Sequence, residues 1–471
     1  MSTPTVLLAV THGFAARYLL QTDVLAALQR AGATVVVLAP NAEDVSMASE
    51  YPSVRLEPLR SGLGRAERSS LWFFLSHVRM FALAGRSGAF LNRWEGFEAR
   101  YRTKNPWMTR AIRAGLRVAW RSRAARRALV RLESRLYAPL VNSDAFERWR
   151  PDVVATASVG YVAEDALVLR EARRRGVPCA GIVMGWDNPT SKGYRGADPD
   201  RIVVWSDRMA DLVSELQDFP RPRIDVAGVA HFDRYVRPGA LPARKALCAQ
   251  LGLDPARPLI LYATSSPGAW TRNVDVAETL VTAIDDGRLA GGQLVVRVHP
   301  NYFRADTPAS LGPFERLAAN RADVRLDRPG IVAGGMRIRL DNDDATRLGA
   351  LIAHADVLVN MFSTTTVEAC LCDTPVVQVS QHAYDAPDER FTSGRRQAWP
   401  QYIHMRRVVE IGAARTAESP DQLVSLVAAY LADPALDRAA RADAARVECG
   451  PTDGHAGERL AGYLLALARE S

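Results

Sequence analysis

Short runs of apolar, mostly β-branched residues alternate with segments of helical periodicity twice along this chain, and this alternation limits the folds open to it. The first series begins at Thr5 and the second at Leu259. Continuous apolar runs of this kind are typical of strands buried on both faces, as in a parallel sheet. Parallel strands joined by helices need right-handed crossovers, so each series predicts an open α/β sheet covered by helices.

The expected elements fall into two series. In the first we expect strands over 5–10, 34–38, 152–156, 179–184, 202–205 and 224–226, with helices over 17–31, 161–175 and 207–216. In the second we expect strands over 259–263, 294–298, 357–360 and 376–379, with helices over 274–286, 343–355 and 365–372. Three further helices are expected to begin near Pro420, Ala435 and His455.

The length of 471 residues exceeds what one hydrophobic core usually organises, so two domains are expected. Pro and Gly residues between 232 and 242 interrupt any regular element and indicate a linker. We expect an N-terminal Rossmann-like domain over 1–238 and a C-terminal Rossmann-like domain over 239–450. A final helix over 451–471 is expected to pack back towards the first domain. A helical insert rich in arginine and tryptophan interrupts the first domain at 60–150.

The composition is that of a folded globular protein, with 48% hydrophobic and 24% charged residues. No run of 18 uncharged apolar residues occurs, which argues against a transmembrane helix. The first ten residues have no basic segment ahead of their apolar run and are not expected to be a signal peptide. Five scattered cysteines form no zinc-binding pattern and fit a reducing compartment. We expect a cytoplasmic protein, with peripheral attachment to the inner face of the cell membrane as the alternative.

Two polar motifs stand where expected strands of the second series end. Arg297-Val-His-Pro300 follows one apolar run, and Phe362-Ser-Thr-Thr365 follows another and opens a helix. Ligands of open α/β sheets collect at the carboxyl ends of the strands. An imidazole donor beside a helix N-terminus with free N–H groups suits a diphosphate. The pattern therefore favours a nucleotide-diphosphate ligand.

A dinucleotide cofactor is not expected. Neither series has Gly-x-Gly-x-x-Gly after its first strand: the loops are Thr11-His-Gly-Phe-Ala-Ala16 and Thr264-Ser-Ser-Pro-Gly268. Two such halves joined by a linker instead favour a transferase with its active site in the cleft between them.

Six short motifs in a fixed order give the chain a family resemblance. They lie at Gly185–Gly193, Gly228–Asp233, Leu261–Thr264, Arg297–Pro300, Asp356–Thr364 and Asp453–Arg459. Over roughly 150–470 this order resembles the GT-B nucleotide-sugar enzymes, and within them the CDP-glycerol glycerophosphotransferase (teichoic-acid polymerase) group and its surface-polysaccharide glycosyltransferase relatives. The resemblance implies the GT-B fold: two Rossmann-like domains facing a central cleft, followed by C-terminal helices.

The chain departs from that group at the acceptor-side loop. The resemblance implies a catalytic His-Gly there, whereas this chain has Trp186-Asp-Asn188. We therefore expect sugar transfer from a nucleotide-sugar to a hydroxyl acceptor, by an inverting reaction with an aspartate base, in polysaccharide or glycolipid assembly. Polyol-phosphate transfer, nucleotide-sugar 2-epimerisation and a nucleotide-binding subunit without catalytic activity stay open as alternatives.

The donor site is expected at three strand ends of the second domain. Hydroxyl and backbone donors would come from Thr264, Ser265 and Ser266, and an imidazole donor from His299. Ser363, Thr364 and Thr365 are candidates for the diphosphate because a helix cap needs only one of these hydroxyls. By resemblance to GT-B enzymes, Glu368 would bind the donor's ribose, with a capping-box role as the alternative. Arg297 is a further candidate, with a structural salt bridge as the alternative.

The acceptor side is expected at the loop after the strand that begins at Cys179. Asp187 is the candidate base, since partial desolvation would raise its pKa towards the working pH. The alternative is that Asp187 and Asn188 only stabilise the turn before Pro189. His12 is the rival base, and Lys192 and Asn188 are candidates for contacts to an anionic leaving group or acceptor.

No metal or other cofactor is expected to take part. No Asp-x-Asp motif stands where a GT-A-type enzyme would place its metal ligands, and Asp341-Asn-Asp343 precedes a helix as a cap would. Oriented hydroxyl and N–H donors in a cleft of low dielectric can stabilise the leaving group instead.

The insert carries a strong positive charge. Between 100 and 135 there are twelve basic residues and one acid, Glu133, and arginines recur at helical spacing with Trp107, Ile112, Leu116 and Trp120 supplying an apolar face. This pattern is typical of a helix lying on an anionic membrane surface, where it would bring a lipid-linked acceptor to the cleft. The alternative is a solvated arginine face. No nucleic acid partner is expected, because no aromatic recognition motif accompanies the charges.

Overall fold

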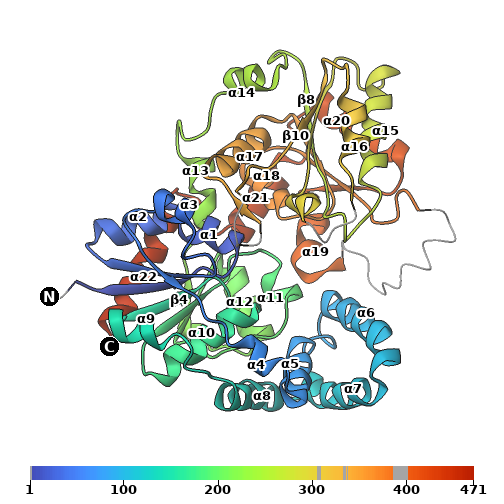
Figure 1. The fold of residues 1–471 in the computed structure, drawn as a ribbon. Coiled ribbons are helices and arrows are strands. Elements are labelled where there is room, and N and C mark those ends of the chain that lie inside the picture. Colours follow the sequence, from blue (N-terminus) through green and yellow to red (C-terminus); the bar gives the residue numbers. More distant parts are fainter. Residues whose placement is uncertain (1–2, 305–308, 333–335, 337, 386–400, 471) are drawn as a thin grey trace.

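The computed structural model describes residues 3–304, 309–332, 336, 338–385 and 401–470. It contains two parallel sheets, each covered by helices, which lie in separate halves of the molecule (Figure 1). The chain therefore has the expected α/β architecture of two Rossmann-like domains.

The first sheet has seven parallel strands in the order β3-β2-β1-β4-β5-β6-β7. Its order changes direction between β1 and β4, where neighbouring loops diverge and leave room for a ligand. The strands are β1 (Thr5–Ala9), β2 (Thr34–Ala39), β3 (Arg55–Pro58), β4 (Val153–Thr156), β5 (Cys179–Ile182), β6 (Arg201–Val204) and β7 (Ile224–Val226). The helices are α1 (Gly13–Leu19), α2 (Asp23–Arg30), α3 (Val45–Glu50), α10 (Ala163–Arg174), α11 (Asn188–Ser191) and α12 (Asp207–Leu216), with the 3₁₀ turns η1 (Arg221–Arg223) and η2 (Ala230–Phe232).

The second sheet has six parallel strands in the order β10-β9-β8-β13-β14-β15. The strands are β8 (Leu259–Ala263), β9 (Gln293–Arg297), β10 (Val324–Asp327), β13 (Val357–Asn360), β14 (Val376–Val379) and β15 (Arg415–Ala417). The helices and turns are α14 (Arg244–Leu251), α15 (Asn273–Asp285), η3 (Pro300–Phe303), α16 (Gly312–Ala318), α17 (Asn342–His354), α18 (Thr365–Leu371), α19 (Ile403–Glu410), α20 (Pro420–Ala432) and α21 (Arg438–Glu448). A separate antiparallel pair joins β11 (Ile331–Val332) to β12 (Arg339–Leu340).

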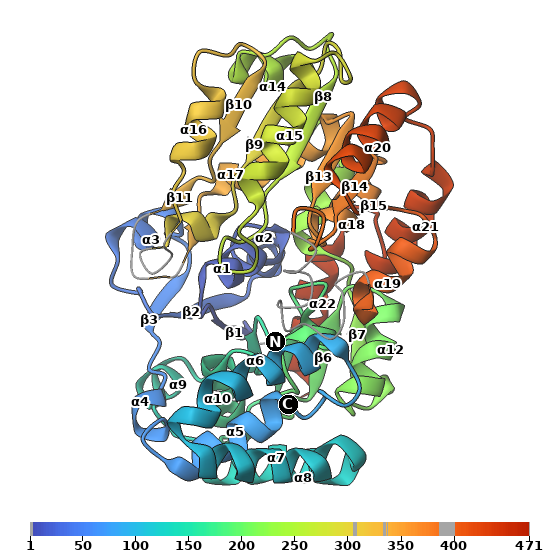
Figure 2. The same cartoon turned by 90° about the vertical axis from the view of Figure 1, so that its right-hand side faces the viewer.

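The insert between β3 and β4 is helical, as expected. It comprises α4 (Leu63–Ala66), α5 (Ser70–Met80), α6 (Gly88–Lys104), α7 (Pro106–Arg121), α8 (Arg123–Leu136) and α9 (Ser143–Trp149). Helices α5 to α8 enclose an aromatic core that includes Phe81, Phe90, Trp94 and Phe97. Figure 2 shows α7 and α8 side by side along the edge of the molecule farthest from the second sheet. Within the described residues, no helix is long and apolar enough to cross a membrane.

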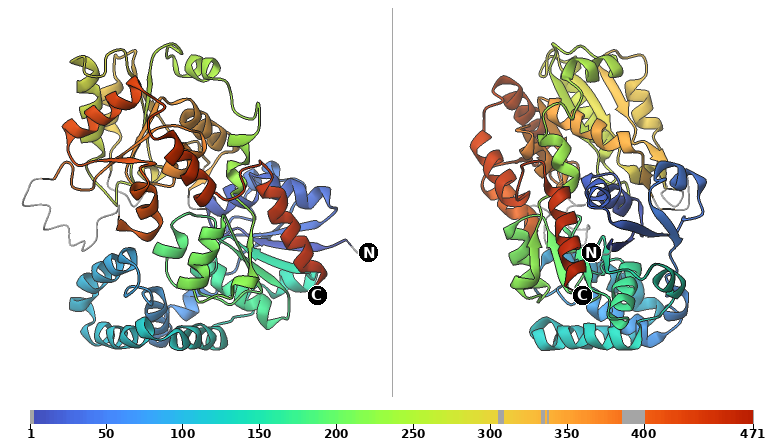
Figure 3. Two further views of the ribbon diagram at one scale, coloured as in Figure 1. Left: turned by 180° about the vertical axis from the view of Figure 1, so that it is seen from behind. Right: turned by 90° about the vertical axis from the view of Figure 1, so that its left-hand side faces the viewer.

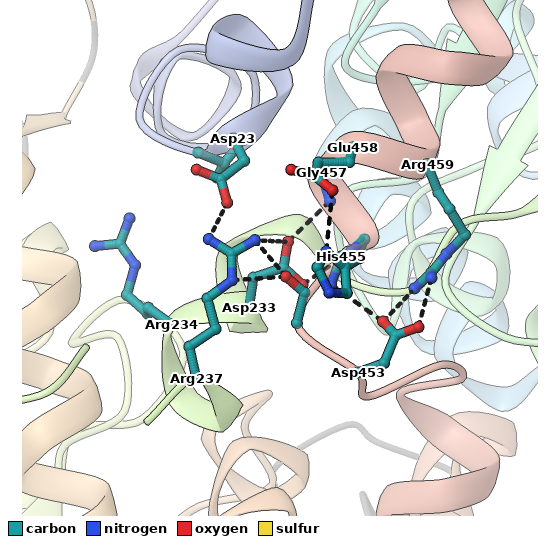
Figure 4. A network of polar contacts seen from close by, with 12 residues as sticks. Asp23, Asp233, Arg234, Arg237, Asp453, His455, Gly457, Glu458 and Arg459 are labelled. Atoms are coloured by element: carbon teal, nitrogen blue, oxygen red, sulfur yellow. Dashed lines mark hydrogen bonds and ion pairs between the residues drawn. The ribbon is translucent and has the colours of Figure 1, made fainter. Parts of the chain in front are cut away.

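The crossover α13 (Asp233–Val236) and the last helix, α22 (Ala456–Arg469), tie the two halves together. Helix α22 packs on α2, β1 and β4 of the first domain, where both ends of the chain lie (Figure 3). The Asp233 carboxylate accepts hydrogen bonds from the backbone N–H groups of Ala456 and Gly457, at 3.0 and 2.9 Å. Arg237 bridges this site to Asp23 and to the carbonyl of Gly454 (Figure 4).

A second contact joins the domains through the β11–β12 pair. A Cβ atom at Gly13 would lie 1.8 Å from the carbonyl oxygen of Ile338, so only glycine permits this approach. Gln21 donates to the carbonyl of Leu340 at 2.8 Å, and the buried Arg339 pairs with Glu50. These contacts hold the first domain against the second.

The structure differs from the sequence expectations at a few elements. The helix expected over 17–31 is two helices, because Thr22 begins a new one: its hydroxyl accepts from the N–H of Val24 and donates to the carbonyl of Tyr18. Strands β3, β10 and β15 were not expected. All three are edge strands and carry charged residues, so they lack the continuous apolar pattern of the inner strands.

We predict that Asp233→Ala lowers the free energy of unfolding by about 3 kcal/mol, because two buried N–H groups lose a charged acceptor. Urea denaturation measures the change. Asp453→Ala is the matched control, since its pair with Arg459 is half exposed and is expected to contribute less than about 1 kcal/mol. Equal losses in the two variants would contradict the special role of Asp233.

Candidate functional site

Two adjoining cavities lie between the domains, with volumes of about 420 and 250 Å³. Both are lined by Phe14, Lys192 and Thr364, so together they form one branched cleft. The loops that line it follow β1, β5, β8, β9 and β13, at the carboxyl ends of these strands. This is the position at which open α/β sheets bind ligands.

Loops of the second domain supply one wall of the larger cavity. Thr264, Ser265, Ser266 and His299 all line it, as the sequence predicts. The Thr264 hydroxyl accepts from the backbone N–H of His299 at 2.9 Å, and the Ser266 hydroxyl accepts from the Asn301 amide at 2.9 Å. The loops after β8 and β9 therefore hold each other in place.

The His299 ring is held as a neutral hydrogen-bond donor. Its Nδ1 accepts from the backbone N–H of Asn301 at 3.0 Å, which puts the proton of the neutral ring on Nε2. Burial, helped by nearby Arg297, lowers the pKa of His299 to about 4. A neutral imidazole that donates from Nε2 suits a phosphate or ribose oxygen.

The hydroxyls after β13 divide into two pairs. Ser363 and Thr364 line the cavity, and the Thr364 side chain makes no capping bond to its own helix. The hydroxyls of Thr365 and Thr366 instead accept from the Asn360 amide, at 2.9 and 3.0 Å, and Thr365 does not line either cavity. Phe362 has a φ of 46°, a conformation that costs a non-glycine residue energy and is concentrated at functional sites.

The smaller cavity contains Glu368 and a cation that the sequence analysis missed. Glu368 is buried, burial raises its pKa, and its Oε2 accepts from the Tyr235 hydroxyl at 2.7 Å. Arg17 lines the same cavity, and its buried Nε has no hydrogen-bond partner among the described residues. Nothing in the local pattern of α1 distinguishes Arg17 from an ordinary surface arginine.

The first domain supplies the opposite wall through the loop after β5. Asp187 and Lys192 form an ion pair at 3.0 Å, and the Ser191 hydroxyl donates to the same carboxylate at 2.5 Å. Burial acts to raise the pKa of Asp187, but Lys192, His404 and Ser191 outweigh it and lower the pKa to about 2. The expected rise of this pKa is therefore wrong, because the ion pair dominates the desolvation. Asn188 lines the smaller cavity.

Besides Thr365, two further predicted site residues lie outside the cavity linings. Arg297 is 5% exposed and pairs with Asp327 and Asp344, at 2.6 and 2.5 Å, which corresponds to its structural alternative. The His12 Nδ1 caps α1 by accepting from the N–H of Ala15, and burial lowers the pKa of His12 to about 4. Its Nε2 therefore carries the proton of the neutral ring, which makes His12 a donor rather than a base.

His404, on α19 of the second domain, is the second residue that the sequence analysis missed. It lines the larger cavity and lies edge-on to Trp186, whose indole N–H donates to Glu448 at 2.9 Å. The Thr190 hydroxyl lies 3.1 Å from the carbonyl of Asp187, to which it donates, and 2.7 Å from the Nδ1 of His404. Since that hydroxyl has only one proton, it accepts from Nδ1–H, and the Nε2 of His404 keeps its lone pair.

Metal coordination has no candidate in the described part of the chain, where His, Cys, Asp and Glu side chains do not gather in threes. The absence of a metal requirement stays a prediction from the sequence.

Comparison with known proteins identifies the fold class. The sequence matches no protein-family model and no curated protein. Among solved structures, S. aureus MnaA in complex with UDP is similar with a TM-score of 0.55 and 11% identity, over 99% of this chain and 98% of that one. The calicheamicin glycosyltransferase CalG4 is similar with a TM-score of 0.52 and 12% identity, over 99% and 98%.

A UDP-GlcNAc 2-epimerase from Neisseria meningitidis, bound to UDP-GlcNAc, is similar with a TM-score of 0.52 and 11% identity, over 98% of this chain and 100% of that one. Glycosyltransferases and epimerases thus share this architecture with the chain. The protein has the GT-B fold, as its sequence motifs predict.

Proposed function

We propose that the protein transfers a sugar from a nucleoside-diphosphate or CMP donor to a hydroxyl acceptor, with inversion at the anomeric carbon. The observation that carries this proposal is the pairing of two unlike walls across one cleft. Neutral donors from the second domain face the Asp187–Lys192 ion pair of the first domain. The unprotonated imidazole nitrogen of His404, whose ring contacts Thr190 of the first domain, lines the same cavity. The first set suits an anionic donor, and the second suits proton removal from an acceptor.

The donor's phosphates would lie against Ser363, Thr364 and the Nε2–H of His299, with Thr264, Ser265 and Ser266 completing that wall. Arg17 and Lys192 would stabilise the negative charge that develops on the leaving nucleotide. Glu368, whose other oxygen is held by Tyr235, would bind the ribose. UDP and UDP-GlcNAc in two structures of the same fold support a nucleotide-sugar donor.

We assign the proton acceptor to His404 and give Asp187 a supporting role. The acceptor hydroxyl oxygen bonds to the anomeric carbon while the bond from that carbon to the phosphate oxygen breaks, and the nucleotide leaves with the electron pair. The proton passes to the Nε2 of His404. The carboxylate of Asp187 then stabilises the imidazolium, because the attraction between the two groups acts against the burial that lowers the pKa of His404 to about 4. With a pKa of about 2, the Asp187 carboxylate is the weaker base of the two groups.

The activity is tested by incubating the purified protein with nucleotide-sugar donors, with and without hydroxyl acceptors. We expect a glycosylated product and free nucleotide only when acceptor is present, and the same turnover in EDTA. A new sugar isomer formed without acceptor would indicate an epimerase. Transfer of a polyol phosphate would indicate the glycerophosphotransferase reaction, and loss of turnover in EDTA would contradict the metal-free mechanism.

Nucleotide binding is tested separately by thermal unfolding with UDP, CDP, GDP, TDP and CMP. A ligand at 100 times its Kd stabilises the folded protein by about 2.7 kcal/mol. We predict that Ser363→Ala and His299→Ala each weaken binding about 10–100-fold, the value of one hydrogen bond to a charged group. Ser425→Ala, on the exposed face of α20, is the control and is expected to bind normally. No stabilisation by any of the five nucleotides would contradict the donor site.

We predict that His404→Gln lowers kcat about 10²–10⁴-fold with little change in the donor KM, because it removes the base and leaves the phosphate contacts. With a pKa of about 4, His404 stays neutral at ordinary pH. The acidic limb of kcat/KM should therefore lie near pH 4–5 in the wild-type protein. Asp187→Asn should reduce kcat less than His404→Gln does. A larger loss of kcat in Asp187→Asn than in His404→Gln would indicate that Asp187 is the base.

A further inference from the structure

The outer faces of α7 and α8 combine positive charge with exposed apolar side chains. Residues Trp107, Arg110, Ala114, Arg117, Val118 and Arg121 are all exposed and share one side of α7. The opposite side, with Ile112 and Leu116, is buried against the insert's core. Helix α8 repeats this division, with Arg131, Leu132, Arg135 and Leu136 exposed. We call these exposed residues of the two helices the basic face.

The basic face holds cations that the fold does not use. Within the described part of the chain, no ion pair or hydrogen bond engages the side chains of Arg117, Arg121, Arg131 and Arg135. The one acid of this segment, Glu133, is fully buried and pairs with Arg79 and Arg170. Other arginines here do have structural roles: Arg126 pairs with the buried Asp218, and Arg113 with Glu98. The unpaired cations therefore stand on the exposed sides of α7 and α8.

Large apolar groups lie exposed among these cations. Trp107 is 77% exposed, Val118 59%, Leu136 51% and Leu132 44%, and Arg110 stacks over the Trp107 ring at 5.2 Å. Exposed tryptophan and leucine beside arginine are costly in water and favourable where acyl chains meet anionic headgroups. A purely solvated arginine face would not need these side chains.

We propose that the basic face docks the protein on an anionic lipid bilayer. Helices α7 and α8 run side by side at one edge of the molecule, which lets both lie on one surface (Figure 2). Their arginines contact phosphate headgroups, and Trp107 and the leucines enter the interface. The cations could bind either anionic lipid or nucleic acid. The exposed apolar residues favour the membrane, because a nucleic acid would contact the cations alone.

The same helical bundle contacts the loop that carries Asp187 and Lys192. The hydroxyl of Ser87 donates to the carbonyl of Thr190 at 2.8 Å, and Arg93 on α6 donates to the carbonyl of Ser191. Docking would thus hold the acceptor side of the cleft near the bilayer. If the protein catalyses the proposed transfer reaction, this arrangement indicates that the acceptor is a hydroxyl compound linked to a lipid.

The test is sedimentation of the purified protein with vesicles of phosphatidylcholine alone or mixed with phosphatidylglycerol, without donor or acceptor. We expect binding only to the anionic vesicles, and weaker binding as salt is added. Each basic residue near the surface contributes about a fivefold factor, so the triple variant Arg117→Gln, Arg131→Gln, Arg135→Gln should bind roughly a hundredfold less. Trp107→Ala should also weaken binding.

The matched control is Arg55→Gln, Lys245→Gln, Arg469→Gln, which removes the same charge from exposed positions elsewhere. It is expected to bind vesicles as the wild type does. Equal losses in the two triple variants, or no vesicle binding by the wild type, would overturn the proposal. The proposal would also be overturned if the protein bound a DNA or RNA duplex tightly, lost that binding in the triple variant of Arg117, Arg131 and Arg135, and did not bind vesicles. Because no substrate is present, vesicle binding without transferase activity would refute the proposed function alone.

Discussion

The Asp233 carboxylate links the two domains and helps to fix their relative position. It lies on the crossover helix, in a buried position, and accepts two N–H groups at the start of α22. A buried carboxylate without such donors would be strongly unfavourable, so the position of the crossover helix is coupled to that of the returning helix. Helix α22 then packs on the first domain, and the carboxyl ends of the two sheets come to face one cleft.

The cleft is consequently a product of both domains. Trp186 and Thr190 of the first domain pair with Glu448 and His404 of the second, and Tyr235 of the crossover holds Glu368. Each of these contacts crosses the boundary at which a hinge would open. A change in domain angle would therefore alter the hydrogen bond that fixes the His404 tautomer as well as the size of the cavity. In the proposed mechanism, the base would therefore depend on the contact between the two domains.

The inner strands could be predicted from the sequence because burial on both faces leaves a continuous apolar run; β8, β13 and β14 lie over the ranges expected. Edge strands such as β3 were not predicted, because charged residues such as Arg55 and Glu57 break that pattern. The same logic applies to the site. Loops directly after inner strands, with Thr264, His299 and Ser363, could be placed from local sequence. His404 and Arg17 could not, because only tertiary packing brings their helices to the cleft.

The pKa of Asp187 shows why residue type and loop position were insufficient to assign its role. Partial burial alone would have made this carboxylate a stronger base, but Lys192 and Ser191, a few residues further along the same turn, stabilise its charged form. Their positions are set in turn by the insert, since Ser87 and Arg93 bind the carbonyls of that turn. The insert therefore helps to position the charged groups on the first-domain wall of the cleft. One helical bundle thus contacts the Asp187 turn on one side and carries exposed arginines on another.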